Sequence, residues 1–89
     1  MKYGNIYATR GIADAMEQSP KFAAEVRRAF GRYQQGDWGD VCEEDRALND
    51  EAARIGERVL AAYQTSGGKI WIITEWDRSA TTILYPDEY

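Results

Sequence analysis

The sequence predicts an α+β fold in which a short N-terminal strand and three to four short helices precede a three-stranded antiparallel β-meander. Two patterns predict this order. Apolar residues recur at helical spacing through residues 20–33, whereas the last third of the chain holds runs of β-branched and aromatic residues separated by turn signals. The length of 89 residues is that of one small domain, predicted to span 1–89.

The first half of the chain is predicted to hold one strand and two helices, at residues 5–9, 11–18 and 20–33. Thr9 and Ser19 suit the N-caps of the two helices, because a hydroxyl can accept a hydrogen bond from a free amide of the first turn. Pro20 favours the first position of the second helix. Residues 34–40 contain two glycines and two aspartates, a composition that predicts a loop.

The second half begins with two predicted short helices. Asp40 and Glu43 have the spacing of a capping box, which predicts a helix to about residue 47, and Asn49 is expected to cap another. The apolar pattern at 52–63 fits either a continued helix or a strand from about residue 58. The strand is favoured because the Gly-rich segment 65–69 is typical of a hairpin loop. Strands are therefore predicted at 59–65, 69–76 and 80–85, with 69–76 in the centre.

Charge is unevenly distributed along the chain. Residues 1–36 carry a net +3, residues 37–57 a net −6, and the whole chain a net −4. This balance argues against a dedicated nucleic-acid-binding protein, which is usually basic. The acidic middle, including Glu44 and Asp45, is either a solvated helix face or a surface that attracts a basic protein partner such as the groove of a nuclease.

Several kinds of chemistry are disfavoured by composition. The chain has no histidine and one cysteine, Cys42, so it lacks the commonest general base and cannot form an internal disulfide. The side chain of Cys42 is expected to be half-buried and to have a packing role only. No cofactor motif is present, and no tightly bound metal and no cofactor are predicted. No apolar run approaches a membrane span and the N-terminus lacks a signal-peptide pattern, which predicts a cytoplasmic protein without a membrane partner.

Two segments contain candidate binding residues. In the first, Asp37, Trp38 and Asp40 are either a structural loop, with Trp38 closing the core, or an exposed tryptophan flanked by carboxylates that grips a protein. In the second, Asp77 and Arg78 are either turn and ion-pair residues or a hairpin tip whose arginine binds a phosphate or carboxylate. The neighbouring residues Glu75 and Trp76 belong to the same candidate surface.

A carboxylate cluster is a further alternative. If the loop at 37–40 lay beside the turn at 77–79, then Asp37, Asp40, Glu75 and Asp77 would meet and could bind Mg²⁺ or Ca²⁺. Such a cluster could also support acid–base chemistry.

The segments 36–40 (GDWGD) and 71–89 (WIITEWDRSATTILYPDEY), with Asp45 and Asn49 between them, resemble a family of small proteins of plasmids, integrative elements and phages. The resemblance covers nearly the whole chain, from Ala8 to Tyr89. It implies no particular activity and assigns no residue a role. What it implies is a setting, that of an accessory gene of a mobile element, among which inhibitors of host defence are frequent.

Three hypotheses about function follow from these observations. The first is a protein-binding inhibitor of a host nuclease defence system, of the anti-CRISPR or anti-restriction type, that does not contact nucleic acid itself. The second is an interaction or regulatory module of a mobile element that forms a homodimer, a state also suggested by the eleven aromatic residues of so short a chain. The third is a small hydrolase that uses carboxylates and a metal.

Overall fold

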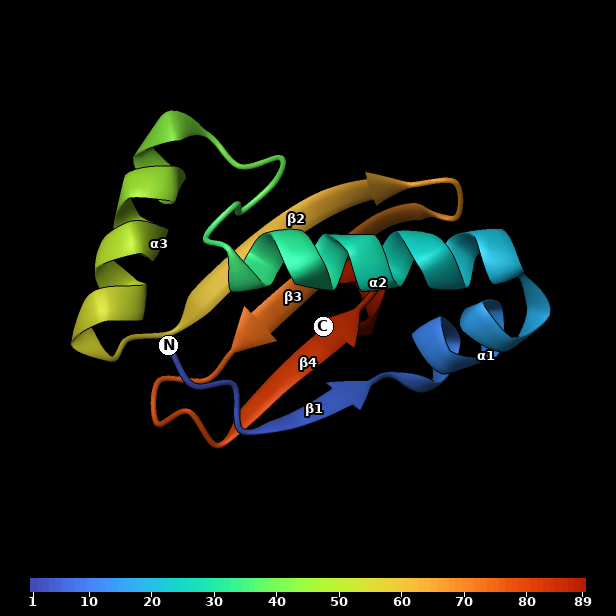
Figure 1. Ribbon diagram of the computed structural model, residues 1–89, viewed down its shortest axis with the longest axis horizontal. Coiled ribbons are helices and arrows are strands. Elements are labelled where there is room, and N and C mark those ends of the chain that lie inside the picture. The colour runs from blue at the N-terminus through green and yellow to red at the C-terminus, as the bar shows by residue number, and fades with distance from the viewer.

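A computed structural model describes all 89 residues, and its architecture is α+β as predicted. Figure 1 shows a sheet with helices α1 and α2 on one face and helix α3 beside the edge formed by β2. No helix combines the length and the apolar character required to cross a membrane. In chain order the elements are β1 (Asn5–Ala8), α1 (Arg10–Gln18), α2 (Pro20–Gln34), α3 (Glu43–Ile55), β2 (Val59–Thr65), β3 (Gly68–Thr74), β4 (Ala80–Leu84) and the 3₁₀ turn η1 (Pro86–Glu88).

The sheet has the strand order β1-β4-β3-β2. Strands β2, β3 and β4 form the predicted antiparallel meander, with β3 between the other two. Ile72 of β3 lies opposite Ala61 of β2 and Ile83 of β4, and all three side chains are buried. Strand β1 joins the sheet by parallel pairing with β4, which leaves its other side as a free edge. The sequence predicts β1 as a strand but does not reveal its partner.

The core lies between α2 and the sheet. The buried face of α2 carries Phe22, Val26, Ala29 and Tyr33, at the helical spacing seen in the sequence. This face packs against alternate side chains of β2 and β3, because successive residues of a strand point to opposite faces. Both predicted caps are present: Thr9 Oγ1 accepts from the Ile12 amide, and Ser19 Oγ from the Phe22 amide.

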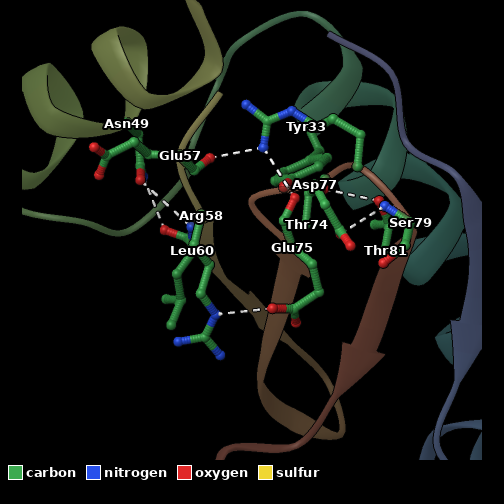
Figure 2. Close-up of polar contacts among 11 residues, drawn as sticks. Tyr33, Asn49, Glu57, Arg58, Leu60, Thr74, Glu75, Asp77, Ser79 and Thr81 are labelled. Atoms are coloured by element: carbon green, nitrogen blue, oxygen red, sulfur yellow. Dashed lines mark hydrogen bonds and ion pairs between the residues drawn. The ribbon is translucent and has the colours of Figure 1, made fainter. Parts of the chain in front are cut away.

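The predicted pair of helices between residues 40 and 55 is wrong, since α3 is one continuous helix. Its N-cap is Cys42, whose exposed side chain makes no capping hydrogen bond, so neither the capping role of Asp40 nor the half-buried Cys42 is observed. Asn49 lies inside the helix and is buried. Its amide donates to the Leu60 carbonyl (2.8 Å) and accepts from the Leu60 amide (3.4 Å), as a neighbouring strand would (Figure 2). This contact with β2 outweighs the preference of asparagine for helix ends.

A chain of buried hydroxyl groups crosses the core between α2 and β4. Thr81 Oγ1 donates to the Tyr3 carbonyl at 2.7 Å. It also lies 2.8 Å from Thr74 Oγ1, which in turn lies 2.6 Å from the Tyr33 hydroxyl (Figure 2). Because the proton of Thr81 is used by Tyr3, Thr74 must donate to Thr81, and Tyr33 must donate to Thr74. Burial raises the pKa of Tyr33 to about 12, so this donor keeps its proton at any physiological pH.

Candidate interaction surface

Trp38 is a core residue, and the hypothesis of an exposed tryptophan in the 37–40 loop is wrong. Its side chain is only 4% exposed, its ring meets that of Tyr33 edge-on at 5.3 Å between centroids, and its Nε1 donates to Asp50 Oδ1 at 2.8 Å. A buried indole needs such an acceptor for its single N–H. Trp38 therefore fastens the loop and helix α3 to the core and is not available to a partner.

The loop itself extends the sheet. Gly39 lies beside Ala62 of β2, where the Ala62 amide donates to the Trp38 carbonyl (3.1 Å) and the Asp40 amide donates to the Ala62 carbonyl (2.6 Å). Asp37 is held by two hydrogen bonds from Arg32, at 2.7 and 3.2 Å, and by the Gly39 amide. The hydrogen bond from Arg32 is the main reason that the pKa of Asp37 lies below its ordinary value. Asp37 is thus a structural residue, and Asp40 is exposed with its amide in the bridge.

Substitution of Gly39 tests the bridge between the loop at 37–40 and β2. Gly39 has a φ of +75°, and a Cβ at this position would overlap the Ala62 carbonyl oxygen. Gly36 has nearly the same φ, +77°, but open space around it. We expect Gly39→Ala to lower the free energy of unfolding by about 3 kcal/mol and Gly36→Ala by only about 1 kcal/mol, because both residues bear left-handed strain but only Gly39 is sterically blocked. Urea unfolding of the two variants measures the difference; equal losses would contradict the bridge to β2.

Arg78 does not present its guanidinium to a ligand, so the hypothesis of a phosphate-binding hairpin tip is wrong. Its side chain turns inward and donates to the carbonyls of Glu57 (2.7 Å), Glu75 (3.1 Å) and Ala52 (2.8 Å). The backbone of Arg78 has a φ of +60°, the left-handed region, which closes the turn between β3 and β4. Arg78 therefore fixes the C-terminal end of α3 to this turn.

The four carboxylates of the proposed cluster do not meet. No group of three or more acidic, cysteine or histidine side chains is arranged to hold a metal ion. Glu75 pairs instead with Arg58, at 3.7 Å between Oε1 and Nε, and Asp77 accepts a hydrogen bond from the Ser79 amide at 3.0 Å (Figure 2). Hydrogen bonding by Ser79, first through its side chain and then through its amide, lowers the pKa of Asp77. Asp37 is bound by Arg32, so the alternative of a carboxylate cluster shared between the loop at 37–40 and the turn at 77–79 is not observed.

The outer flank of helix α3 is an exposed surface that mixes acidic and apolar residues. Glu44, Leu48, Glu51 and Ile55 follow one another at a spacing of four, three and four residues, which places them in one line along the helix. All four are exposed; Leu48 is 63% and Ile55 51% exposed. We call these four residues the α3 stripe. Asp45 is also exposed and borders it.

The turn after β3 adds a large aromatic side chain at the same end of the molecule. Trp76 is 67% exposed and Asp77 is exposed beside it. The contacts of Arg78 with Ala52 and Glu57 hold this turn against the C-terminal end of α3, the end that carries Ile55. Four of the predicted site residues therefore lie on accessible surface: Glu44, Asp45, Trp76 and Asp77. The side chains of Trp38 and Arg78 instead make hydrogen bonds within the protein.

No protein-family model, no curated protein and no solved structure matches this chain. The function must therefore be inferred from the surface itself. Sequence reasoning missed Leu48 and Ile55, although their spacing of seven residues, in a helix whose buried residues are Asn49 and Ala52, was a usable signal. Two helices that meet at residue 49, as the sequence predicts, would not place Leu48 and Ile55 on one continuous face, whereas the single helix α3 does.

Proposed function

We propose that this protein is a protein-binding accessory factor of a mobile genetic element that acts in the cytoplasm and inhibits a host nuclease of the restriction or CRISPR type. The single observation that supports this most is the α3 stripe, in which two exposed apolar side chains alternate with carboxylates on an acidic helix. The resemblance to small proteins of plasmids and phages supplies the setting. The partner is thus a basic protein surface with apolar contact sites.

Charge explains why a nuclease channel is a suitable partner. Residues 37–57 carry eight of the fifteen acidic residues, and all of Glu43, Glu44, Asp45 and Glu51 are exposed on α3. A channel that binds DNA or RNA is lined with lysine and arginine, which attract such a helix and orient it during approach. Leu48 and Ile55 then supply the apolar contact that slows dissociation.

The proposal is tested by cleavage assays with a panel of purified restriction endonucleases and CRISPR effector nucleases. Each nuclease is incubated with a molar excess of the chain before its DNA substrate is added, and the rate of cleavage is measured. We expect the chain to suppress cleavage by at least one nuclease and to leave the naked DNA unshifted on a native gel. Unchanged cleavage by the whole panel, or a shift of the DNA by the chain itself, would contradict the proposal.

A further inference from the structure

The two edge strands of the sheet, β2 and β1, differ in whether their outward backbone groups have hydrogen-bond partners. At the β2 edge, the outward backbone groups of two residues are paired: those of Leu60 with the side chain of Asn49, and those of Ala62 with the backbone of Trp38 and Asp40. The β1 edge has no such cover, because β1 pairs only with β4. It also lacks proline, lysine and any other charged side chain, the usual devices that keep an edge strand from pairing.

The backbone of β1 is arranged symmetrically about Tyr7. The amide of Asn5 donates to the carbonyl of Ser79, the residue just before β4, and the amide of Thr9 donates to the carbonyl of Ile83 in β4. Since alternate residues of a strand direct their backbone groups to opposite sides, Ile6 and Ala8 face the free edge. A second copy of β1, antiparallel to the first and centred on Tyr7, would place Ile6 opposite Ala8 and Ala8 opposite Ile6. Each of these pairs exchanges two hydrogen bonds, so every outward group of Ile6 and Ala8 is satisfied.

The side chains of β1 fit the same arrangement. Ile6 is 52% exposed and borders a groove of about 390 Å³ between β1 and the helices, lined by apolar residues such as Ala8, Met16 and Phe30, with Arg27 as its one charged residue. In the antiparallel pairing, the isoleucine of one copy stands opposite the small Ala8 of the other and enters this groove. On the opposite face of the sheet, Tyr7, which is 53% exposed, meets Tyr7 of the second copy.

We propose that the chain forms a two-fold homodimer through the free edge of β1, with Tyr7 at the axis. A second copy is the occupant because the strand is complementary to itself in both backbone and side-chain size, large opposite small on each side of the axis. The two sheets become one continuous sheet, and the grooves of both copies are covered. Because α3 lies beside β2, the opposite edge of the sheet, both α3 stripes remain free and the dimer is bivalent (Figure 1).

Disulfide trapping tests the pairing at residue level. In the background Cys42→Ser, which removes the exposed native thiol, Tyr7→Cys places two thiols in a non-hydrogen-bonded pair with Cα atoms about 4.5 Å apart, a separation that a disulfide spans. The matched control is Leu48→Cys in the same background, since Leu48 is similarly exposed but lies on α3. Under mild oxidation we expect the Tyr7→Cys chain to form covalent dimers roughly tenfold faster than the control, because pairing raises the effective concentration of its thiols.

Sedimentation equilibrium of the native chain completes the test without any substitution. We expect a reversible monomer–dimer equilibrium between micromolar and millimolar concentration. Tyr7→Lys and Tyr7→Glu should each be monomeric, because like charges would meet at the axis, and a mixture of the two should form a heterodimer. A native chain that stays monomeric over this range, or equal cross-linking rates for Tyr7→Cys and Leu48→Cys, would overturn the proposal. A monomeric chain that still inhibits a nuclease would refute the dimer and leave the proposed function standing.

Discussion

Reversal of Glu44, Asp45 and Glu51 to lysine is expected to slow association with the nuclease proposed as the partner by about ten- to a thousandfold. The three substitutions change the net charge from −4 to +2 and convert the exposed flank of α3 from acidic to basic. Attraction between exposed charges is screened within about 8–10 Å at physiological salt, so it acts mainly while the two proteins approach each other. The effect is therefore on the association rate and disappears as salt is raised.

The control is a variant with the same change of charge in a different place. Asp14, Glu17 and Asp87 are exposed and lie outside α3, so their reversal to lysine should affect association much less. Glu44 and Asp45 lie in the first turn of α3, where carboxylates interact favourably with the helix dipole. Their reversal is expected to cost about 1 kcal/mol of stability, and rates are measured well below the melting temperature. Equal rates for the two variants would show that the acidic residues of α3 only keep the surface solvated.

Substitution of Leu48 distinguishes the effect of apolar contact in the complex from the effect of electrostatic attraction during association. Leu48→Ala removes an exposed apolar side chain from the centre of the α3 stripe without any change of charge. We expect this variant to associate at the native rate and to dissociate roughly tenfold faster, since apolar contacts at the centre of an interface mainly slow dissociation. The sequence alone suggested Trp38 for this role, and its burial in the core rules that out.

Substitution of Thr74 by valine is expected to cause a large loss of stability. Valine has nearly the shape of threonine but cannot accept the hydrogen bond of Tyr33 or donate to Thr81. The buried Tyr33 hydroxyl is then left without an acceptor, which costs about 2 kcal/mol and lowers the melting temperature by roughly 10 °C. Thermal unfolding followed by circular dichroism measures this loss.

Two further variants identify the cause of the stability loss in Thr74→Val. Thr82→Val changes a half-buried threonine of β4 outside this hydroxyl chain and is expected to be nearly neutral, because valine suits a strand. In the double variant Tyr33→Phe/Thr74→Val, the unpaired hydroxyl is absent, so the total loss should be smaller than the sum of the two single losses. An additive result would show that the hydroxyl chain is not the reason for the instability of Thr74→Val.

The parts of the fold that could be predicted from the sequence depend on local patterns. The stripe of α2 and the caps Thr9 and Ser19 involve residues within four positions of each other, and the structure confirms them. The meander follows from the glycine-rich hairpin segment between two β-branched runs. The pairing of β1 with β4 joins residues about 75 positions apart, and no short-range signal encodes it.

The candidate site was predicted less well because several of its polar residues have long-range partners. Asn49 and Arg78 look like a helix cap and a turn residue in the sequence, but their side chains bind the backbone of Leu60 and of Ala52, Glu57 and Glu75. For Trp38 the sequence leaves open both a core position and an exposed one; the structure has the core position, where Asp50 of α3 accepts the indole N–H. Exposure of Glu44 and Asp45 was predicted correctly, since it depends only on helical spacing.

Competition with nucleic acid is the most direct test of the claim that α3 covers a basic channel of the nuclease. A catalytically inactive form of the inhibited nuclease is bound to fluorescently labelled substrate DNA, and the chain is titrated in while the anisotropy of the DNA is recorded. We predict that the chain displaces the DNA, that more chain is needed at higher DNA concentration, and that the Glu44, Asp45 and Glu51 reversal variant fails to displace it. A nuclease that binds the chain and retains its DNA with unchanged affinity would contradict the account.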